Sequence, residues 1–364
     1  MQIDNFQDPT MSIILRTARW IGVAVLAFEL VWPAKSAHAD DQQVRAKIAV
    51  LRWMGMTVET NTSPDGLICV TRVAINTSAN ITDTGLALLG SLQELSSLHI
   101  YGGRYTEAGL SHLKQLKGLR ILSLYRSPIG DAGLAHLSGL KNLDTLYLDF
   151  TQISDTGLAH LSGLKNLRTL NLDFTQISDA GLANIKGLKN LRSLSLVHTS
   201  IGDAGAIYLK HLSNLKYLTL KHTKITDAGL AHLRGLDDLE TLDLTGTRAG
   251  NTGLSYLKTM RELWDLNLDS TRISDEGLAQ LENLSGLQVL SLAQTAITDA
   301  GLVHLGKISR LRGLTLSQTA ITDAGLPHLR NLRYLEKLHL ENTKVKAAGV
   351  RELKKALPKL EVVR

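Results

Sequence analysis

The chain has 364 residues, more than a single compact core usually supports, so two ordinary domains or one elongated repeat array is expected. Hydrophobic residues make up 44% of the chain and aromatic residues only 4%, so burial depends on Leu, Ile, Val and Ala, and a disordered chain is excluded. The net charge of +6 is spread without a basic run, which argues against a nucleic-acid partner.

Residues 1–39 have the pattern of a signal peptide. Two arginines precede the apolar segment 20–28, and the small residues Ala37 and Ala39 stand three and one positions before Asp40. We therefore expect cleavage after Ala39 and export to the periplasm, the cell envelope or the medium. An uncleaved anchor is the alternative, but the segment is shorter than the ~20 residues that span a bilayer. No membrane span is expected after cleavage.

Residues 40–69 are predicted to form an N-terminal cap. An amphipathic helix ends at Gly55, and a hairpin turns at 63–66 between two alternating runs. An exposed end repeat lined with leucine needs such a cover.

A period of 24 residues organises residues 70–349. Glycine recurs without a slip at 85, 109, 133, 157, 181, 205, 229, 253, 277, 301, 325 and 349, each time in a tetrad related to Asp-X-Gly-Leu. A pattern L-x-x-L-x-L precedes each glycine, and a degenerate copy opens the array at 70–75. Such self-similarity predicts an α/β solenoid of about 12 repeats, followed by a C-terminal cap over residues 350–364.

Within one repeat, Leu146 and Leu148 alternate with Tyr147 and predict a short strand with its leucines inward. Ser154 is a candidate cap for the short helix that follows, and Gly157 is expected to permit close backbone approach between repeats.

The array resembles leucine-rich repeats through L-x-x-L-x-L-x-x-T-x-I-[ST]-D-x-G-L. It is most similar to the cysteine-containing subclass found in F-box proteins and bacterial relatives. The resemblance implies a ribonuclease-inhibitor-like horseshoe with a parallel sheet on the concave face and short helices on the convex face. One column departs from that subclass, because threonine stands where it usually has Cys or Asn, as at Thr151, Thr175 and Thr199. A threonine hydroxyl is still expected to bond the neighbouring turn.

Residues with the potential for catalysis or metal binding are sparse, and neither an enzyme, a cofactor nor a metal is expected. Cys69 has no partner cysteine and is predicted to be structural. A zinc site at the pair His198 and His222, with Asp173 in the preceding repeat, is conceivable but lacks a clear third and fourth ligand. Asp149 and Asp173 have the spacing of a glycosidase pair, yet an open sheet would not exclude water from them.

Side chains that face out of the sheet carry the functional prediction. The outward columns of the first repeats hold aromatic, acidic and histidine side chains, whereas later repeats hold small or polar ones such as Ser291 and Ser317. The candidate partner-binding residues are Tyr101, Tyr125, Tyr147, Asp149, Phe150, Asp173, Phe174, His198, Tyr217 and His222. Exposed aromatic side chains over a concave surface are typical binding anchors. Packing of Phe150 and Phe174 along the loop edge, without any ligand, remains the alternative.

The sequence thus predicts an exported, secreted or envelope-bound bacterial scaffold that binds a protein partner on its concave face. A glycan-binding protein of the cell envelope is the second hypothesis. A ubiquitin-ligase substrate receptor follows only from the F-box resemblance, and an export signal would remove the chain from the cytosol.

Overall fold

The computed structural model describes residues 37–62, 67–75 and 81–364, and it divides into two compact units, 1–143 and 144–364. Most of the predicted signal peptide and the hairpin turn at 63–66 lie outside the described residues. The helix α3 begins at Ala37, so the expected cleavage site lies in its first turn, and cleavage stays a prediction.

The first unit combines a helix, an antiparallel strand pair and the first parallel strands. Its elements are α3 (Ala37–Trp53), β1 (Thr57–Thr62), β2 (Ile68–Ile75), α4 (Asp83–Gly90), β3 (Ser97–Ile100), η1 (Gly109–Gln115), β4 (Ile121–Ser123) and α5 (Asp131–Ala135). Strand β1 pairs antiparallel with β2, while β2, β3 and β4 run parallel. Ile48 and Leu51 of α3 are buried, which fits the amphipathic pattern of that helix.

The second unit repeats one strand and one short helix. Its strands are β5 (Thr145–Tyr147), β6 (Thr169–Asn171), β7 (Ser193–Ser195), β8 (Tyr217–Thr219), β9 (Thr241–Asp243), β10 (Asp265–Asn267), β11 (Val289–Ser291), β12 (Gly313–Thr315), β13 (Lys337–His339) and β14 (Glu361–Val363). Its helices are α6 (Asp155–Leu158), η2 (Ala159–Leu161), α7 (Asp179–Ile185), α8 (Asp203–Leu209), α9 (Asp227–Ala231), α10 (Asn251–Leu254), α11 (Asp275–Leu278), η3 (Ala279–Asn283), α12 (Leu302–Leu305), η4 (Leu326–Leu329) and α13 (Ala347–Ala356).

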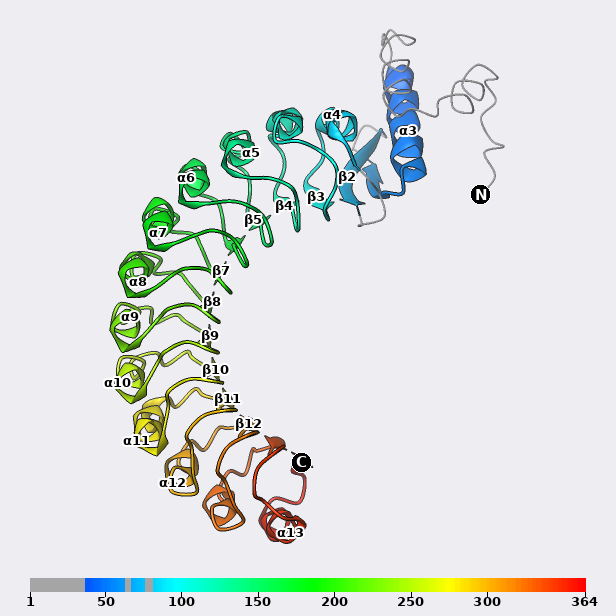
Figure 1. Ribbon diagram of the computed structural model, residues 1–364. Coiled ribbons are helices and arrows are strands. Elements are labelled where there is room, and N and C mark those ends of the chain that lie inside the picture. The colour runs from blue at the N-terminus through cyan, green and yellow to red at the C-terminus, as the bar shows by residue number, and fades with distance from the viewer. Residues whose placement is uncertain (1–36, 63–66, 76–80) are drawn as a thin grey trace. The chain divides into compact units, whose positions relative to one another are not determined.

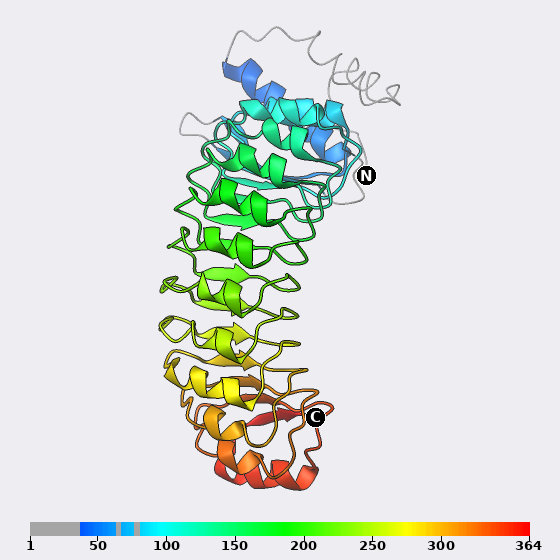
Figure 2. The same cartoon turned by 60° about the vertical axis from the view of Figure 1, so that its left-hand side comes forward.

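The strands of the second unit pair in parallel with a register of one period. Leu146 pairs with Leu170, and Leu170 pairs with Leu194, so equivalent residues of successive repeats lie side by side. In this unit the strands occupy the inner side of the curve and the helices the outer side (Figure 1). Figure 2 shows the helices stacked one repeat above another. The inward leucines of the strands are fully or almost fully buried, which confirms the α/β solenoid.

Helices of the second unit begin on a side-chain acceptor supplied by the preceding repeat, a carboxylate at α7, α8, α9 and α10 and the amide oxygen of Asn251 at α11. Asp155 accepts the backbone N–H of Ser178 at 2.7 Å and also the Ser178 hydroxyl. A Cβ added at Gly181 would lie 2.3 Å from the Asp155 carboxylate. The repeat glycine was expected to admit neighbouring backbone. The space beside Gly181 is occupied by the Asp155 side chain instead, because this carboxylate accepts the Ser178 N–H at the start of the next helix.

The threonine hydroxyls form hydrogen bonds, but within the turn of their own repeat rather than with the neighbouring turn. The hydroxyl of Thr175 donates to the Leu172 carbonyl at 2.5 Å, and that of Thr199 donates to the Leu196 carbonyl at 2.7 Å. Both threonines are buried. The hydroxyl therefore satisfies a carbonyl where the chain leaves the strand.

The last elements close the second unit. Leu353 and Leu357 of the α13 region are buried, and β14 pairs in parallel with β13. Among the helices of the described residues, none combines the length and the apolar character needed to cross a membrane.

Candidate partner-binding site

Each repeat of the second unit leaves its strand through one residue in the left-handed backbone region. We call this position the left-handed column. It holds Phe150, Phe174, His198, His222, Ser270, Gln294, Gln318 and Asn342, with φ between 54° and 58°, and Gly246 with φ of 68°. The backbone N–H of this residue donates to the next repeat, as from Phe150 to the Asp173 carbonyl at 2.9 Å. The left-handed region costs a residue other than glycine roughly 1–2 kcal/mol, so large side chains here need a compensating contact.

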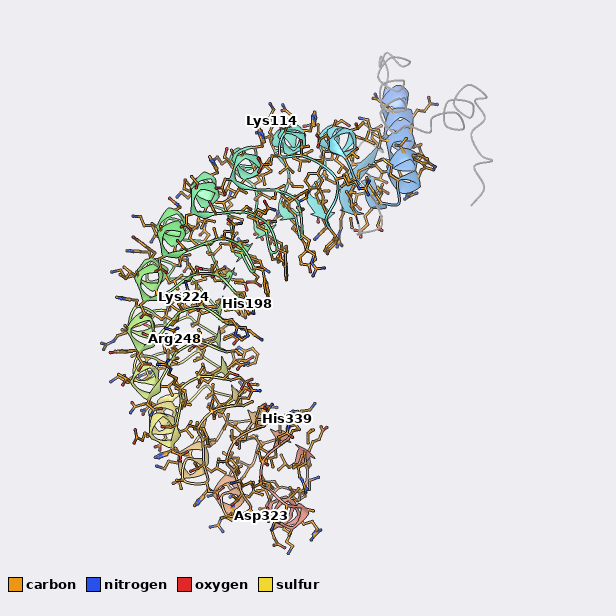
Figure 3. The ribbon with its side chains drawn as sticks, in the orientation of Figure 1. Lys114, His198, Lys224, Arg248, Asp323 and His339 are labelled. Carbon is orange, nitrogen blue, oxygen red and sulfur yellow. The ribbon has the colours of Figure 1, made fainter. Side chains whose placement is uncertain are left out.

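Stacking between repeats supplies that contact in the first half of the unit. The rings of Phe150 and Phe174 are stacked at 4.3 Å between centroids and 10° between planes. Phe174 continues to His198 at 4.5 Å, and His198 continues to His222 at 4.4 Å. We call these four residues the aromatic ladder. Figure 3 labels His198 on the inner, strand-bearing side of the unit.

The ladder stops at Gly246. A Cβ at this glycine would lie 2.1 Å from Nδ1 of His222, so the imidazole occupies the space above it. Beyond the glycine the column is polar: the Ser270 hydroxyl donates to Oε1 of Gln294 at 2.6 Å, and the Gln294 amide donates to Gln318 at 3.1 Å. One backbone position therefore presents rings in one stretch and hydrogen-bonding groups in the next.

The outer surface of the ladder remains accessible. Phe150 is 37% exposed and Phe174 is 42% exposed. Stacking between the rings agrees with the alternative of packing along the loop edge, yet it leaves a large part of each ring in water. Exposed aromatic surface that is held rigid can be buried by a partner at little entropic cost.

The two candidate aspartates precede the ladder phenylalanines, and burial is the main influence on both. Burial raises the pKa of Asp149, opposed by a backbone hydrogen bond and reinforced by the charge of Asp173. Burial also raises the pKa of Asp173, against hydrogen bonds from Ser195 and Val197. Asp173 accepts the Ser195 hydroxyl at 2.5 Å and the Val197 N–H at 2.7 Å, so its carboxylate is anchored on the next strand.

The imidazole at the far end of the ladder is also perturbed. The pKa of His222 is lowered by desolvation, then by the charges of His198 and Lys221, while Asp243 opposes the shift. Within the described residues no cluster of three or more His, Cys, Asp or Glu side chains could hold a metal ion.

The four tyrosines among the candidate partner-binding residues lie outside the aromatic ladder. Tyr147 is half-buried on the outward face of β5. Tyr217, which is 44% exposed, lies at the start of β8 and donates to Glu240 at 3.0 Å, at the opposite end of the strand from His222. Tyr101 and Tyr125 belong to the first unit, where their rings meet edge to face at 5.7 Å. The structure thus joins four of the ten candidates in one stack, with Asp149 and Asp173 beside it.

Exposed aromatic residues also occur in the later repeats, where the outward columns predicted small or polar side chains. Trp264 is 37% exposed and Tyr334 is 61% exposed. Tyr334 lines a cavity of about 250 Å³ together with Gln288, Arg310 and Arg312. Trp264 and Tyr334 lie in the connections before β10 and β13. A comparison of the same connection positions in all repeats would have identified both residues from the sequence.

Comparison with known proteins agrees with this architecture. Residues 141–184 match a family model described as leucine-rich repeats in two copies, and residues 189–248 match one described as leucine-rich repeat. No curated protein matches the chain significantly.

Solved structures extend the likeness over most of the chain. An internalin (inlF) from Listeria monocytogenes has a TM-score of 0.65 and 21% identity, covering 87% of this chain and 93% of its own. A leucine-rich repeat protein from Leptospira interrogans has a TM-score of 0.43 and 18% identity, covering 78% and 95% respectively. At these identities the likeness concerns the fold. The fold is therefore a leucine-rich-repeat solenoid, and the two family models match residues 141–184 and 189–248 within it.

Proposed function

We propose that the protein is an exported, non-catalytic scaffold that binds a protein partner on the strand side of its second unit. Leucine-rich repeat proteins are generally protein-interaction scaffolds. The observation that carries the proposal is the exposed aromatic ladder. At the same column the chain uses Gly246, Ser270 and Gln294, so the backbone does not require rings at Phe150 and Phe174.

The ladder has the properties of an interface anchor. Its rings are rigid because each one is stacked on the next, and its phenylalanines are exposed next to the half-buried Asp149. Aromatic anchors commonly account for 2 kcal/mol or more of binding each, and a neighbouring carboxylate adds orientation.

The test compares two pairs of substitutions in the left-handed column. Phe150→Gln with Phe174→Gln removes the rings but keeps a residue type that already adopts this backbone at Gln294 and Gln318. The partner is first identified by affinity capture and mass spectrometry and then titrated. We expect its Kd to rise by at least about tenfold, with little change in melting temperature, because two glutamines in this column can hydrogen-bond to each other as Gln294 and Gln318 do.

The matched control is Gln294→Ala with Gln318→Ala, in the polar half of the same column. Equal loss of binding in the control would place the interface elsewhere. A lower melting temperature with unchanged binding would mean that the rings serve only the fold.

A glycan is the alternative ligand, because a sugar ring can stack on Phe150 or Phe174 while Asp149 accepts a hydroxyl. A glycan array probed with the wild type and the Phe150→Gln, Phe174→Gln variant separates the two hypotheses. Glycan signals that vanish in the variant, without any captured protein, would favour the sugar.

Export is tested by the intact mass of the protein recovered outside the cytoplasm. We expect a chain that starts at Asp40. Residues 20–39 retained in a membrane fraction would establish an anchor instead.

A further inference from the structure

The connections from helix to strand in three consecutive repeats gather positive charge at one edge of the second unit. Residues 162–168, 186–192 and 210–216 join η2 to β6, α7 to β7 and α8 to β8. They contain no Asp or Glu. Their cationic residues, which we call the basic edge, are Lys165, Arg168, Lys186, Lys189, Arg192, Lys210 and Lys216.

The side chains of the basic edge crowd one another. Lys165 donates to the Gly187 carbonyl at 3.2 Å, and Lys189 donates to the His211 carbonyl at 2.6 Å, so each ammonium group lies over the next connection. The pKa of His211 is lowered by desolvation and then by the charges of Lys189, Lys210 and Lys186. Like charges therefore meet across neighbouring repeats.

The centre of the basic edge has no ion-pair partner in the described part of the chain. No carboxylate oxygen there lies within 4.0 Å of a side-chain nitrogen of Lys186, Lys189, Arg192 or Lys210. All four residues are exposed. Crowded cations without a counter-charge raise the free energy of the free surface, and an anionic partner would lower it.

The two ends of the basic edge indicate which anion fits. Arg168 pairs with Asp144 at 3.5 Å, and Lys216 pairs with Glu240. Each carboxylate comes from the equivalent position one repeat away, since 24 residues separate Lys216 from Glu240. The chain itself thus completes the row of Arg168, Arg192 and Lys216 with a carboxylate at each end, at the spacing of its repeats.

We propose that the basic edge is a docking surface for an acidic polypeptide segment, separate from the aromatic ladder. Its Asp and Glu side chains take, over the central repeats, the place that Asp144 and Glu240 hold at the ends. Side chains on one face of an extended peptide recur about every 7 Å, and parallel strands lie about 4.8 Å apart. The flexible stems of the lysines span that difference.

Other polyanions fit the basic edge less well. The three connections have no Phe, Tyr or Trp on which nucleobases could stack, and the exposed ring that follows the last of them, Tyr217, is hydrogen-bonded to Glu240. Their leucines, such as Leu188 and Leu212, are buried, so no large apolar side chain within them could enter a lipid surface.

The test uses a fluorescent peptide of alternating glutamate and serine, with glutamine replacing glutamate in the control peptide. Lys186→Gln, Lys189→Gln and Lys210→Gln are combined in one variant. Fluorescence anisotropy at low salt is expected to give at least a tenfold rise in Kd for the variant, and no binding of the glutamine peptide.

The matched variant combines Lys354→Gln, Lys355→Gln and Lys359→Gln, which removes the same charge from exposed lysines at the C-terminal end. We expect it to bind the acidic peptide within about twofold of wild type. Equal weakening in both variants would mean a response to net charge alone and would overturn the proposal.

Two further measurements make the test independent of variant folding and of ligand class. Bound peptide should protect Lys186, Lys189 and Lys210 of the wild type from acetylation, and unprotected lysines would contradict the docking surface. Polyphosphate, duplex DNA and phosphatidylglycerol vesicles are titrated in parallel. Binding of any of these through the same lysines, without binding of the peptide, would also overturn the proposal.

Discussion

At the scale of single residues, buried hydroxyl groups and strained backbone positions fix how each repeat leaves its strand. Thr199 illustrates the first, because its hydroxyl satisfies the Leu196 carbonyl inside the turn. Phe174 illustrates the second, with a left-handed backbone whose cost is offset by the rings on either side. Both devices act within one repeat spacing and recur along the unit.

Removing the buried hydroxyl should have a measurable cost. Thr199→Val keeps the shape of the side chain but leaves one lone pair of the Leu196 carbonyl without its donor, so we expect a loss of about 1 kcal/mol in the free energy of unfolding. Urea denaturation measures it. Thr169→Val, at a half-buried outward position of β6, is the control and should change stability by less than about 0.5 kcal/mol. Equal losses at both positions would contradict a special role for the column.

The end of the aromatic ladder should make stability depend on pH. The folded protein holds the pKa of His222 below its ordinary value of 6.5, so the unfolded chain protonates first as the solution is acidified. The contribution of neutral His222 to the free energy of unfolding is fully present above pH 6.5. It is lost as the pH falls through the pKa that His222 has in the folded protein. His222→Phe, which extends the stack, should therefore lose less melting temperature than the wild type on going from about pH 8 to pH 5.

His160→Gln, on the helix side of its repeat, provides the comparison for His222→Phe. If acidification lowers the melting temperature of the wild type and of His222→Phe by the same amount, the imidazole of His222 is not the group that causes the pH dependence.

The sequence predicts the inward leucines and the threonine bonds because both follow from position within one repeat. It predicts that Phe150 and Phe174 face outward, but not that they stack in a left-handed column. That geometry depends on how sharply the chain turns after the strand. The basic edge was not predicted for another reason. Lys165, Lys189 and Lys210 belong to three separate connections of the chain, and only the stacking of the repeats brings them together.

At the scale of elements, the short helices begin where one repeat supplies an acceptor to the next. Asp179 accepts the Gly202 N–H at 2.6 Å, and Asp203 accepts the Thr226 N–H at 2.8 Å. Helices as short as α9 and α10, which begin on Asp203 and Asp227 of the preceding repeats, gain little from their own hydrogen bonds. Their position therefore depends on these contacts and on the buried leucines beneath them.

Gly181→Ala should disturb such a start. The new methyl group would meet the Asp155 carboxylate and displace the acceptor of the Ser178 N–H, so we expect a loss of about 1–3 kcal/mol in unfolding free energy. Gly187→Ala is a matched control, since its methyl group would meet only the flexible end of Lys165. Chemical denaturation of both variants should separate them clearly, and similar values would contradict the proposed contact.

At the scale of the whole molecule, the 24-residue period of the sequence equals the separation between paired residues on neighbouring strands of the sheet. This is why the fold could be predicted from the spacing of glycine and leucine, whereas the exact type of each helix could not. Helices α11 and η3 show the limit, because an α-helical turn there continues as a 3₁₀ segment. Small differences in the last turn are decided by packing rather than by the repeat pattern.

A deletion of one full period should preserve the architecture. Removal of residues 263–286 joins Glu262 to Leu287, which then occupies the place of Leu263, so every column stays aligned. We expect a folded protein with an unchanged circular dichroism spectrum per residue and lower stability. Removal of residues 263–280 shifts the columns against one another and should prevent cooperative folding. A cooperative melt for the second deletion would mean that the period does not set the register.

The carboxylates at the helix starts also give the array a direction of growth. Each one reaches forward to a donor 23 residues later in the chain, as Asp155 does to Ser178, Asp203 to Thr226 and Asp275 to Thr298. Synthesis releases the N-terminal repeats first, so every acceptor stands ready before its donor emerges from the ribosome. During synthesis, each new repeat can therefore dock on a preceding repeat whose acceptor is already in place.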